Sequence, residues 1–92
     1  MQVERHTVQA CCKRVTTILK TDRPIMPTDI QALVNFGFTE SEHFTKAGIL
    51  YVDNSDLIIT GPIGSDRLQV KCKIADCTEK VNDFEVLLQQ LG

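Results

Sequence analysis

The stretch TVQACCKRVTTIL, residues 7–19, decides which fold the sequence predicts. Its apolar residues recur at offsets of three and four positions, which is the spacing of one face of an amphipathic helix. Lys13 and Lys20 fall outside this apolar stripe. We therefore expect a helix over about residues 3–20 that ends before Pro24, because proline disfavours a helical conformation in the preceding residue. The stripe consists of Val8, Cys11, Cys12, Val15, Ile18 and Leu19.

Two later segments carry the start and stop signals of helices. In each, a threonine precedes a glutamine or glutamate by three positions, as in a capping box, and a glycine follows where the helix would end. These signals predict a second helix within TDIQALVNFG and a short third helix within TESEHFTKAG. The residues concerned are Thr28, Gln31 and Gly37 in the first segment, and Thr39, Glu42 and Gly48 in the second.

After Gly48 the apolar period changes to two, which is the period of a strand. The predicted strands are ILYV, DLIIT and RLQVKCKI, separated by the turn sequences DNS and GPIGS. The last segment, DCTEKVNDFEVLLQQLG, is a predicted helix because Asp76 and Glu79 have capping-box spacing. We therefore predict one α+β domain, residues 1–92, with N-terminal helices, a three-stranded antiparallel meander and a C-terminal helix, in the order α-α-α-β-β-β-α.

Composition argues against two classes of protein. The net charge of −2 is nearly neutral, whereas a protein that binds nucleic acid mainly by charge is normally basic. No segment approaches the roughly 18 apolar residues of a membrane helix. The N-terminus, MQVERHTVQ, lacks the apolar run of a signal peptide. We therefore expect a cytoplasmic protein with no membrane contact, whose thiols stay reduced and do not form disulfides.

The four cysteines divide into three that fit a core and one that could react. Cys11 and Cys12 lie within the apolar stripe, and Cys72 takes an inward position on the last strand, where free cysteine packs as a small hydrophobe. Cys77 lies near the start of the last helix, where the backbone stabilises a thiolate. Cys77 is therefore the candidate reactive thiol, and a thiol-based redox sensor is one alternative function.

The sequence contains no pattern typical of catalysis, a cofactor or a metal. His6 and His43 stand outside any nucleophile motif, and no glycine-rich phosphate loop occurs. The cysteine spacing does not match the two close pairs of a structural zinc site. The acidic DNSD segment is typical of a hairpin turn. We therefore expect a protein that is not an enzyme.

The leading functional hypothesis is a small non-catalytic protein-interaction or regulatory module. A small sheet with amphipathic helices often leaves an apolar face for a partner. We also expect a homodimer, because residues 1–27 carry five basic and two acidic residues, while residues 28–65 carry one basic and five acidic residues. The candidate partner contacts are Phe36, Phe38, Phe44 and Tyr51.

A winged-helix nucleic-acid-binding protein is the other alternative. Residues 28–47 could form a helix-turn-helix, and ILYVDNSDLIIT could form the wing. The segment at the place of the recognition helix, TESEHFTKA, has two glutamates and no arginine, which disfavours contact with phosphates and bases. Under this alternative the candidate nucleic-acid contacts are Lys13, Lys20, Lys71 and Lys73.

Overall fold

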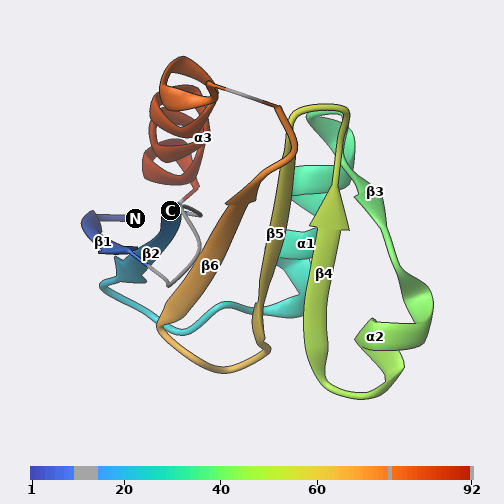
Figure 1. The fold of residues 1–92 in the computed structure, drawn as a ribbon. Helices are drawn as coiled ribbons and strands as arrows, with labels where there is room; N and C mark the ends of the chain where they lie inside the picture. Colours follow the sequence, from blue (N-terminus) through green and yellow to red (C-terminus); the bar gives the residue numbers. More distant parts are fainter. Residues whose placement is uncertain (10–14, 75, 92) are drawn as a thin grey trace.

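The computed structural model describes residues 1–9, 15–74 and 76–91, and this part of the chain forms six strands and three helices (Figure 1). The N-terminal strands are β1 (Val3–Gln9) and β2 (Val15–Thr21). The middle of the chain contains α1 (Pro27–Asn35), β3 (Thr39–Glu40) and α2 (Glu42–Lys46). The remaining elements are β4 (Ile49–Asp53), β5 (Leu57–Pro62), β6 (Arg67–Cys72) and α3 (Thr78–Gln90).

These strands join one antiparallel sheet in the order β1-β2-β6-β5-β4-β3. After β2 the chain passes through α1 to the far edge of the sheet, where β3 pairs with β4. It then returns strand by strand until β6 pairs with β2, with Leu19 opposite Leu68. Strands that lie about fifty residues apart in the sequence are therefore neighbours at the centre of the sheet.

The predicted N-terminal helix over residues 3–20 is wrong, and with it the predicted order of three helices before a three-stranded meander. Residues 3–9 and 15–21 form the antiparallel strands β1 and β2, in which Val3 pairs with Thr21 and Gln9 pairs with Val15. The physical reason is the density of β-branched side chains, which lose rotamer freedom in a helix and fit the pleated surface of a strand. More than half of the residues of the two strands are of this kind: Val3, Thr7, Val8, Val15, Thr16, Thr17, Ile18 and Thr21.

Downstream of β2, helices and strands occur near the predicted segments, but the prediction of a separate three-stranded meander is wrong, because its strands belong to the six-stranded sheet and β3 is not among the predicted strands. The two helices within residues 28–47 are α1 and α2, the meander is β4–β5–β6, and the last predicted helix is α3. Gly37 and Gly48 follow α1 and α2 with φ angles of 104° and 82°. Other residues rarely adopt such positive φ angles, which is why these helices end where the sequence places a glycine.

One face of the sheet carries the core, because α1 and α3 both pack on it. The side chains of Leu33 from α1 and of Phe84 and Leu88 from α3 join the same buried cluster as the inward residues of the sheet. The ring of Phe84 meets the ring of Phe38 edge to face, with centroids 5.7 Å apart. In Figure 1, α1 lies behind β4 and β5. The inward residues of the central strands are Leu19, Leu50, Val52, Leu57, Ile59, Leu68 and Val70.

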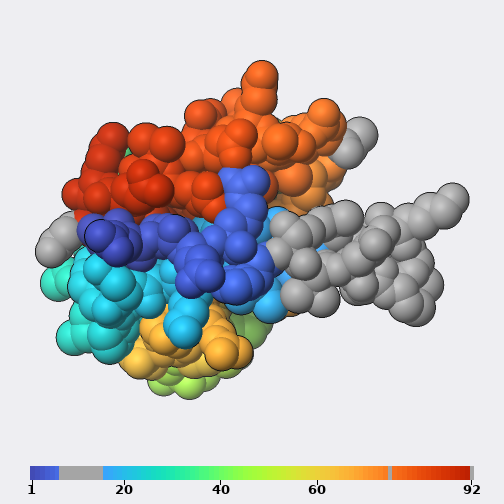
Figure 2. Space-filling model, turned by 90° about the vertical axis from the view of Figure 1, so that its left-hand side faces the viewer, coloured from blue at the N-terminus to red at the C-terminus, as the bar shows by residue number. Residues whose placement is uncertain are grey.

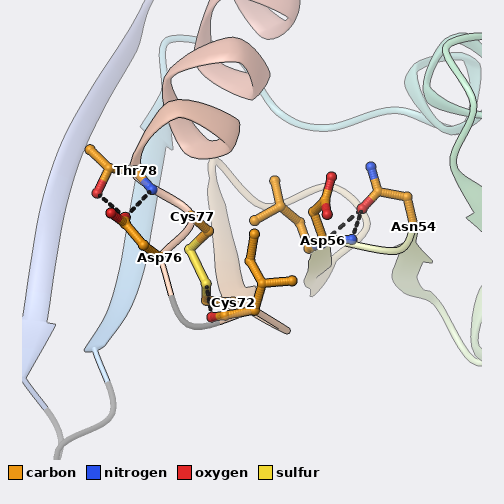
Figure 3. Close-up of a disulfide and its surroundings, with 8 residues drawn as sticks. Asn54, Asp56, Cys72, Asp76, Cys77 and Thr78 are labelled. Carbon is orange, nitrogen blue, oxygen red and sulfur yellow. Dashed lines mark hydrogen bonds between the residues drawn. A yellow bond between two sulfur atoms is a disulfide. The ribbon is translucent and has the colours of Figure 1, made fainter.

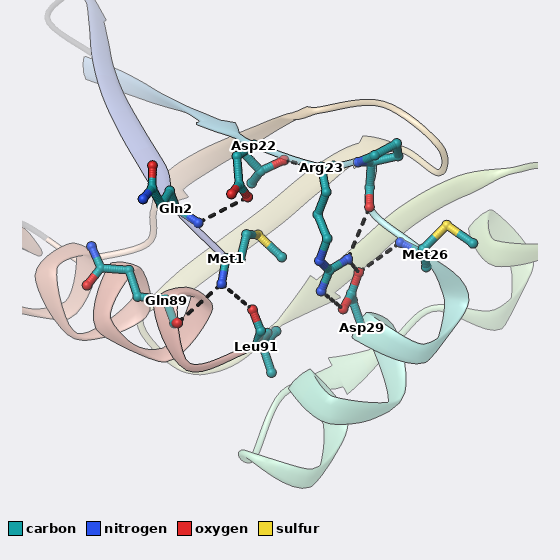
Figure 4. Close-up of polar contacts among 10 residues, drawn as sticks. Met1, Gln2, Asp22, Arg23, Met26, Asp29, Gln89 and Leu91 are labelled. Atoms are coloured by element: carbon teal, nitrogen blue, oxygen red, sulfur yellow. Dashed lines mark hydrogen bonds and ion pairs between the residues drawn. The ribbon is translucent and has the colours of Figure 1, made fainter.

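The two ends of the described chain meet beside this core. The N-terminal ammonium of Met1 donates to the carbonyl oxygen of Leu91 at 2.6 Å (Figure 4). Farther along β1, the guanidinium of Arg5 forms an ion pair with the carboxylate of Glu85 on α3, with Nε and Oε1 2.6 Å apart. Figure 2 shows the N-terminal strand lying along α3. The C-terminal helix is therefore held by the first strand as well as by the core.

An ion pair between a partly exposed arginine and a buried aspartate lies at the start of α1. Arg23 donates from both terminal nitrogens to the two carboxylate oxygens of Asp29, each at 2.8 Å (Figure 4). Asp29 is 5 % exposed and also accepts the backbone N–H of Met26 at 2.8 Å. The Arg23 guanidinium, helped by that N–H, holds the pKa of Asp29 below its ordinary value although burial acts in the opposite direction.

Candidate functional site

The face of the sheet opposite the core is the candidate functional site, and we call it the open face. Strand side chains alternate between the two faces, so the residues next to the buried ones project here. The cross-strand register aligns Ile18, Gln69, Thr60 and Tyr51 in one row across β2, β6, β5 and β4. The open face comprises Ile18, Lys20, Ile49, Tyr51, Asp53, Ile58, Thr60, Arg67, Gln69 and Lys71.

An aromatic pair lies at the β4 side of the open face. The ring of Phe44 from α2 stacks on the ring of Tyr51, with centroids 4.8 Å apart and planes 14° from parallel. Thr45 holds this short helix in place, because its hydroxyl donates to the carboxylate of Glu40 on β3 at 2.7 Å. Stacking of this kind contributes beyond the area that the rings bury. The pair is therefore a fixed, partly accessible apolar feature.

A shallow depression of about 440 Å³ lies beside this pair, near the turn that joins β5 to β6. Its floor exists because Gly61 lets the two strands approach closely: a Cβ atom at this position would lie 2.7 Å from the carbonyl oxygen of Arg67. The lining is largely apolar. It consists of Ile18, Ile49, Thr60, Gly61, Pro62, Arg67, Leu68 and Gln69.

Cations follow the β2–β6 side of the open face. Lys20 pairs with Arg67 across the strands, and Lys71 lies four residues farther along β6. Lys73, just beyond β6, reaches back across the sheet to form an ion pair with Asp53 on β4 at 2.7 Å. The open face therefore has a basic side on β6 and an acidic residue on β4.

The structure separates the four predicted partner contacts. Phe44 and Tyr51 come together on the open face, as described above. Phe36 is exposed at the end of α1, whereas Phe38 is 7 % exposed and belongs to the core. Ile18 is predicted on the apolar stripe of a helix, and its place in the same row as Tyr51, with β6 and β5 between them, depends on the sheet order. The sequence therefore gave no signal for the full extent of this surface.

The predicted nucleic-acid contacts have mixed positions. Lys20 and Lys71 lie on the open face, and Lys73 is the partner of Asp53. Lys13, together with Cys11 and Cys12, lies outside the described residues. In the described ranges, no group of three or more His, Cys, Asp and Glu residues is arranged to hold a metal ion.

A second chemical feature lies where β6 ends and α3 begins, because Cys72 and Cys77 form a disulfide there (Figure 3). Their Cα atoms are 6.0 Å apart, a common separation for such a bridge. Cys72 is exposed and Cys77 is half-buried beside the core. The predictions that Cys72 is buried and that the cysteines avoid disulfides are therefore wrong, because β6 ends where the chain turns directly into α3.

Asp76, inside the ring that this bridge closes, forms hydrogen bonds with the first residue of α3. The carboxylate of Asp76 accepts the backbone N–H of Thr78 at 3.1 Å and the hydroxyl of Thr78 at 2.9 Å (Figure 3). These two hydrogen bonds lower the pKa of Asp76 from its ordinary value. Cys77 directly precedes the first turn of α3, which confirms its predicted place near the start of the last helix.

Comparisons with known protein families, with curated proteins and with solved structures give no match for this chain. In the described part of the chain, each helix is too short or too polar to span a membrane.

Proposed function

We propose that this protein is a non-catalytic protein-interaction module whose open face binds a second copy of the same chain. The observation that supports this is the set of apolar side chains that α1 and α3 leave uncovered. Ile18, Tyr51 and Ile58 are half-buried on this face, and Ile49 is 37 % exposed. Burying apolar surface contributes about 25 cal/mol per Å², so covering this face favours association.

The charges of the open face are arranged for a self-complementary contact. In the register, Lys71 of β6, Ile58 of β5 and Asp53 of β4 form one row. A two-fold axis that runs along β5 between two stacked sheets exchanges the β6 side with the β4 side. Ile58 then faces its own copy, and Lys71 faces Asp53 of the other copy. Isologous contacts of this kind are the commonest route to a dimer.

Attraction between charges alone would not hold two copies together, because several charged side chains already form ion pairs within one chain. Arg5 is paired with Glu85, and Arg23 is paired with Asp29. The predicted attraction between a basic N-terminal segment and an acidic middle segment is thus partly satisfied within one molecule. The apolar surface supplies the driving force in this proposal, and the row of Lys71 and Asp53 supplies the register.

The proposal is tested by the mass in solution of the parent and of two matched variants. Ile49→Glu places a charge on the open face, and Val86→Glu places the same charge on α3, where Val86 is 52 % exposed. Light scattering should give a mass that rises above 10.3 kDa with concentration for the parent and for Val86→Glu. Ile49→Glu should stay at the monomer mass. A parent that is monomeric up to hundreds of micromolar contradicts the proposal.

Nucleic acid is the second candidate partner, favoured by Lys20, Arg67 and Lys71 lying on one face with Tyr51. Cations beside an accessible aromatic ring suit a single strand. Light scattering of the protein mixed with a single-stranded oligonucleotide at low salt distinguishes nucleic-acid binding from self-association. A complex with the oligonucleotide that weakens steeply with added salt would favour this candidate over self-association.

A further inference from the structure

We propose that Cys72 and Cys77 are a reversible thiol–disulfide site that exchanges with low-molecular-weight thiols and disulfides of the glutathione class. This inference goes beyond the interaction function and does not depend on it. It rests on two cysteines at the junction of a strand and a helix, on their difference in exposure, and on the elements that their bond joins.

The position of the pair makes it accessible without unfolding. Cys72 is the last residue of β6 and is exposed, and the connecting residues Lys73, Ile74 and Asp76 are exposed as well. The Cα separation of 6.0 Å lies within the range in which two cysteines bond without movement of the backbone. The bond can therefore open and close while the sheet stays intact.

The difference between the two cysteines assigns their roles. Cys72 is an exposed residue that a bulky thiol can approach, whereas Cys77 is half-buried against the core. Cys77 precedes a 13-residue helix, whose N-terminal N–H groups and dipole favour an anion. The carboxylate of Asp76 is a competing anion at this helix start, because it already accepts the N–H of Thr78. We therefore assign Cys72 as the attacked sulfur and Cys77 as the leaving thiolate.

The exchange balances as two displacement steps. A glutathione thiolate attacks Sγ of Cys72, so that a mixed disulfide forms, the bond to Cys77 breaks, and the electron pair leaves on Sγ of Cys77. A second glutathione thiolate attacks the glutathione sulfur of the mixed disulfide and releases the Cys72 thiolate. Both cysteine thiolates then take up a proton according to the pH. Two glutathione molecules are oxidised to one disulfide, and the protein disulfide is reduced by two electrons.

The bond has a structural consequence because it connects β6 to α3. Val81, Phe84 and Leu88 of α3 are part of the core, while the first turn of the helix is largely exposed. The ring closed by the disulfide holds that first turn next to the end of β6. Reduction should therefore loosen the start of α3 and leave its later turns packed, because their contacts do not involve the bridge.

Two matched variants in glutathione buffers test the site. Cys77→Ser leaves Cys72 without its resolving partner, so oxidised glutathione should add one glutathione to Cys72 and mass mapping should find it there. In Cys72→Ser, oxidised glutathione should modify Cys77 more slowly, because burial of Cys77 against the core limits access more than the helix start activates its thiolate. In the parent, mapping after alkylation should show Cys72 and Cys77 changing together between bonded and alkylated forms as the buffer ratio changes.

Hydrogen exchange gives the structural readout. On reduction, the amides at the start of α3 should exchange at least several-fold faster, and those around Phe84 and Leu88 should not change. The proposal is overturned if both cysteines remain free in excess oxidised glutathione. It is also overturned if the bond resists excess reduced glutathione, or if Cys77 is the faster target in the single variants.

Discussion

The two faces of the sheet are made from the same strands, yet they meet different surroundings. On β4, Leu50 and Val52 are fully buried beneath the helices, while Ile49 and Tyr51 between and beside them stay accessible on the open face. Because side chains alternate along a strand, a single strand serves both faces. The covered face is where substitutions should change stability, and the open face is where they should change association.

The largest expected effect comes from the covered face. Phe84→Ala removes a ring that is 2 % exposed and packs edge to face against Phe38, so it should lower the free energy of unfolding by about 3–5 kcal/mol. Tyr51→Ala on the open face is the matched aromatic variant and should cost less than half as much. Urea unfolding of both measures the difference. Equal losses would mean that the open face is also part of the folding core.

Elements with local sequence signals are predicted better than elements that depend on pairing between distant segments. The later helices and the strands β4, β5 and β6 are located by glycines and by alternation, which are local signals. The predicted caps Thr28, Thr39 and Asp76 are wrong, because the helices begin after Met26, Ser41 and Cys77. β1 and β2 are predicted wrongly, because the apolar spacing of residues 7–19 also fits a helix and the pairing of β2 with β6 joins segments far apart in the chain. Ile18 and Leu19 fit one helical stripe, yet as neighbours in a strand they project to opposite faces, with Leu19 fully buried.

The candidate sites follow the same division. Phe44 and Tyr51 are predicted from the sequence, Phe44 as one of the phenylalanines around the Gly37 turn and Tyr51 as an aromatic residue on the first strand of the meander. The strand order alone places Ile18, Gln69 and Thr60 in one row with Tyr51, with Thr60 directly opposite it. Cys72 and Cys77 are close in the sequence. The expected reducing compartment nevertheless predicts that they stay unpaired. The tight connection between β6 and α3 is what places the two sulfurs together.

A second prediction concerns the edge of the covered face, where Asp29 is buried against Arg23. Because its folded-state pKa is lowered, Asp29 contributes stability above its unfolded pKa of about 3.9, and that contribution is lost as the pH falls through the lower folded value. Asp29→Asn should therefore destabilise the protein by about 1–3 kcal/mol at pH 7, since it leaves Arg23 without its partner.

The pH dependence separates this ion pair from general acid effects. The difference in unfolding free energy between the parent and Asp29→Asn should shrink as the pH falls from 4 toward 2, to be followed by urea unfolding at each pH. Asp83→Asn, at an exposed position on α3, is the control and should track the parent. A difference that stays constant down to pH 2 would show that the carboxylate charge is not the source of the effect.

The smallest expected effect tests the geometry of the open face itself. If two copies stack about an axis along β5, Lys71 of one copy faces Asp53 of the other, and each Lys71→Asp or Asp53→Lys variant should weaken the dimer a few-fold. Exposed ion pairs contribute about 0.2–1 kcal/mol each, and a symmetric dimer contains the contact twice. The double variant exchanges the two charges and should recover most of the lost affinity. The recovery is the informative quantity, because Asp53→Lys also breaks the pair with Lys73 within the same chain. If the two single losses simply add in the double variant, Lys71 and Asp53 do not face each other, and a dimer through this face would need a different axis.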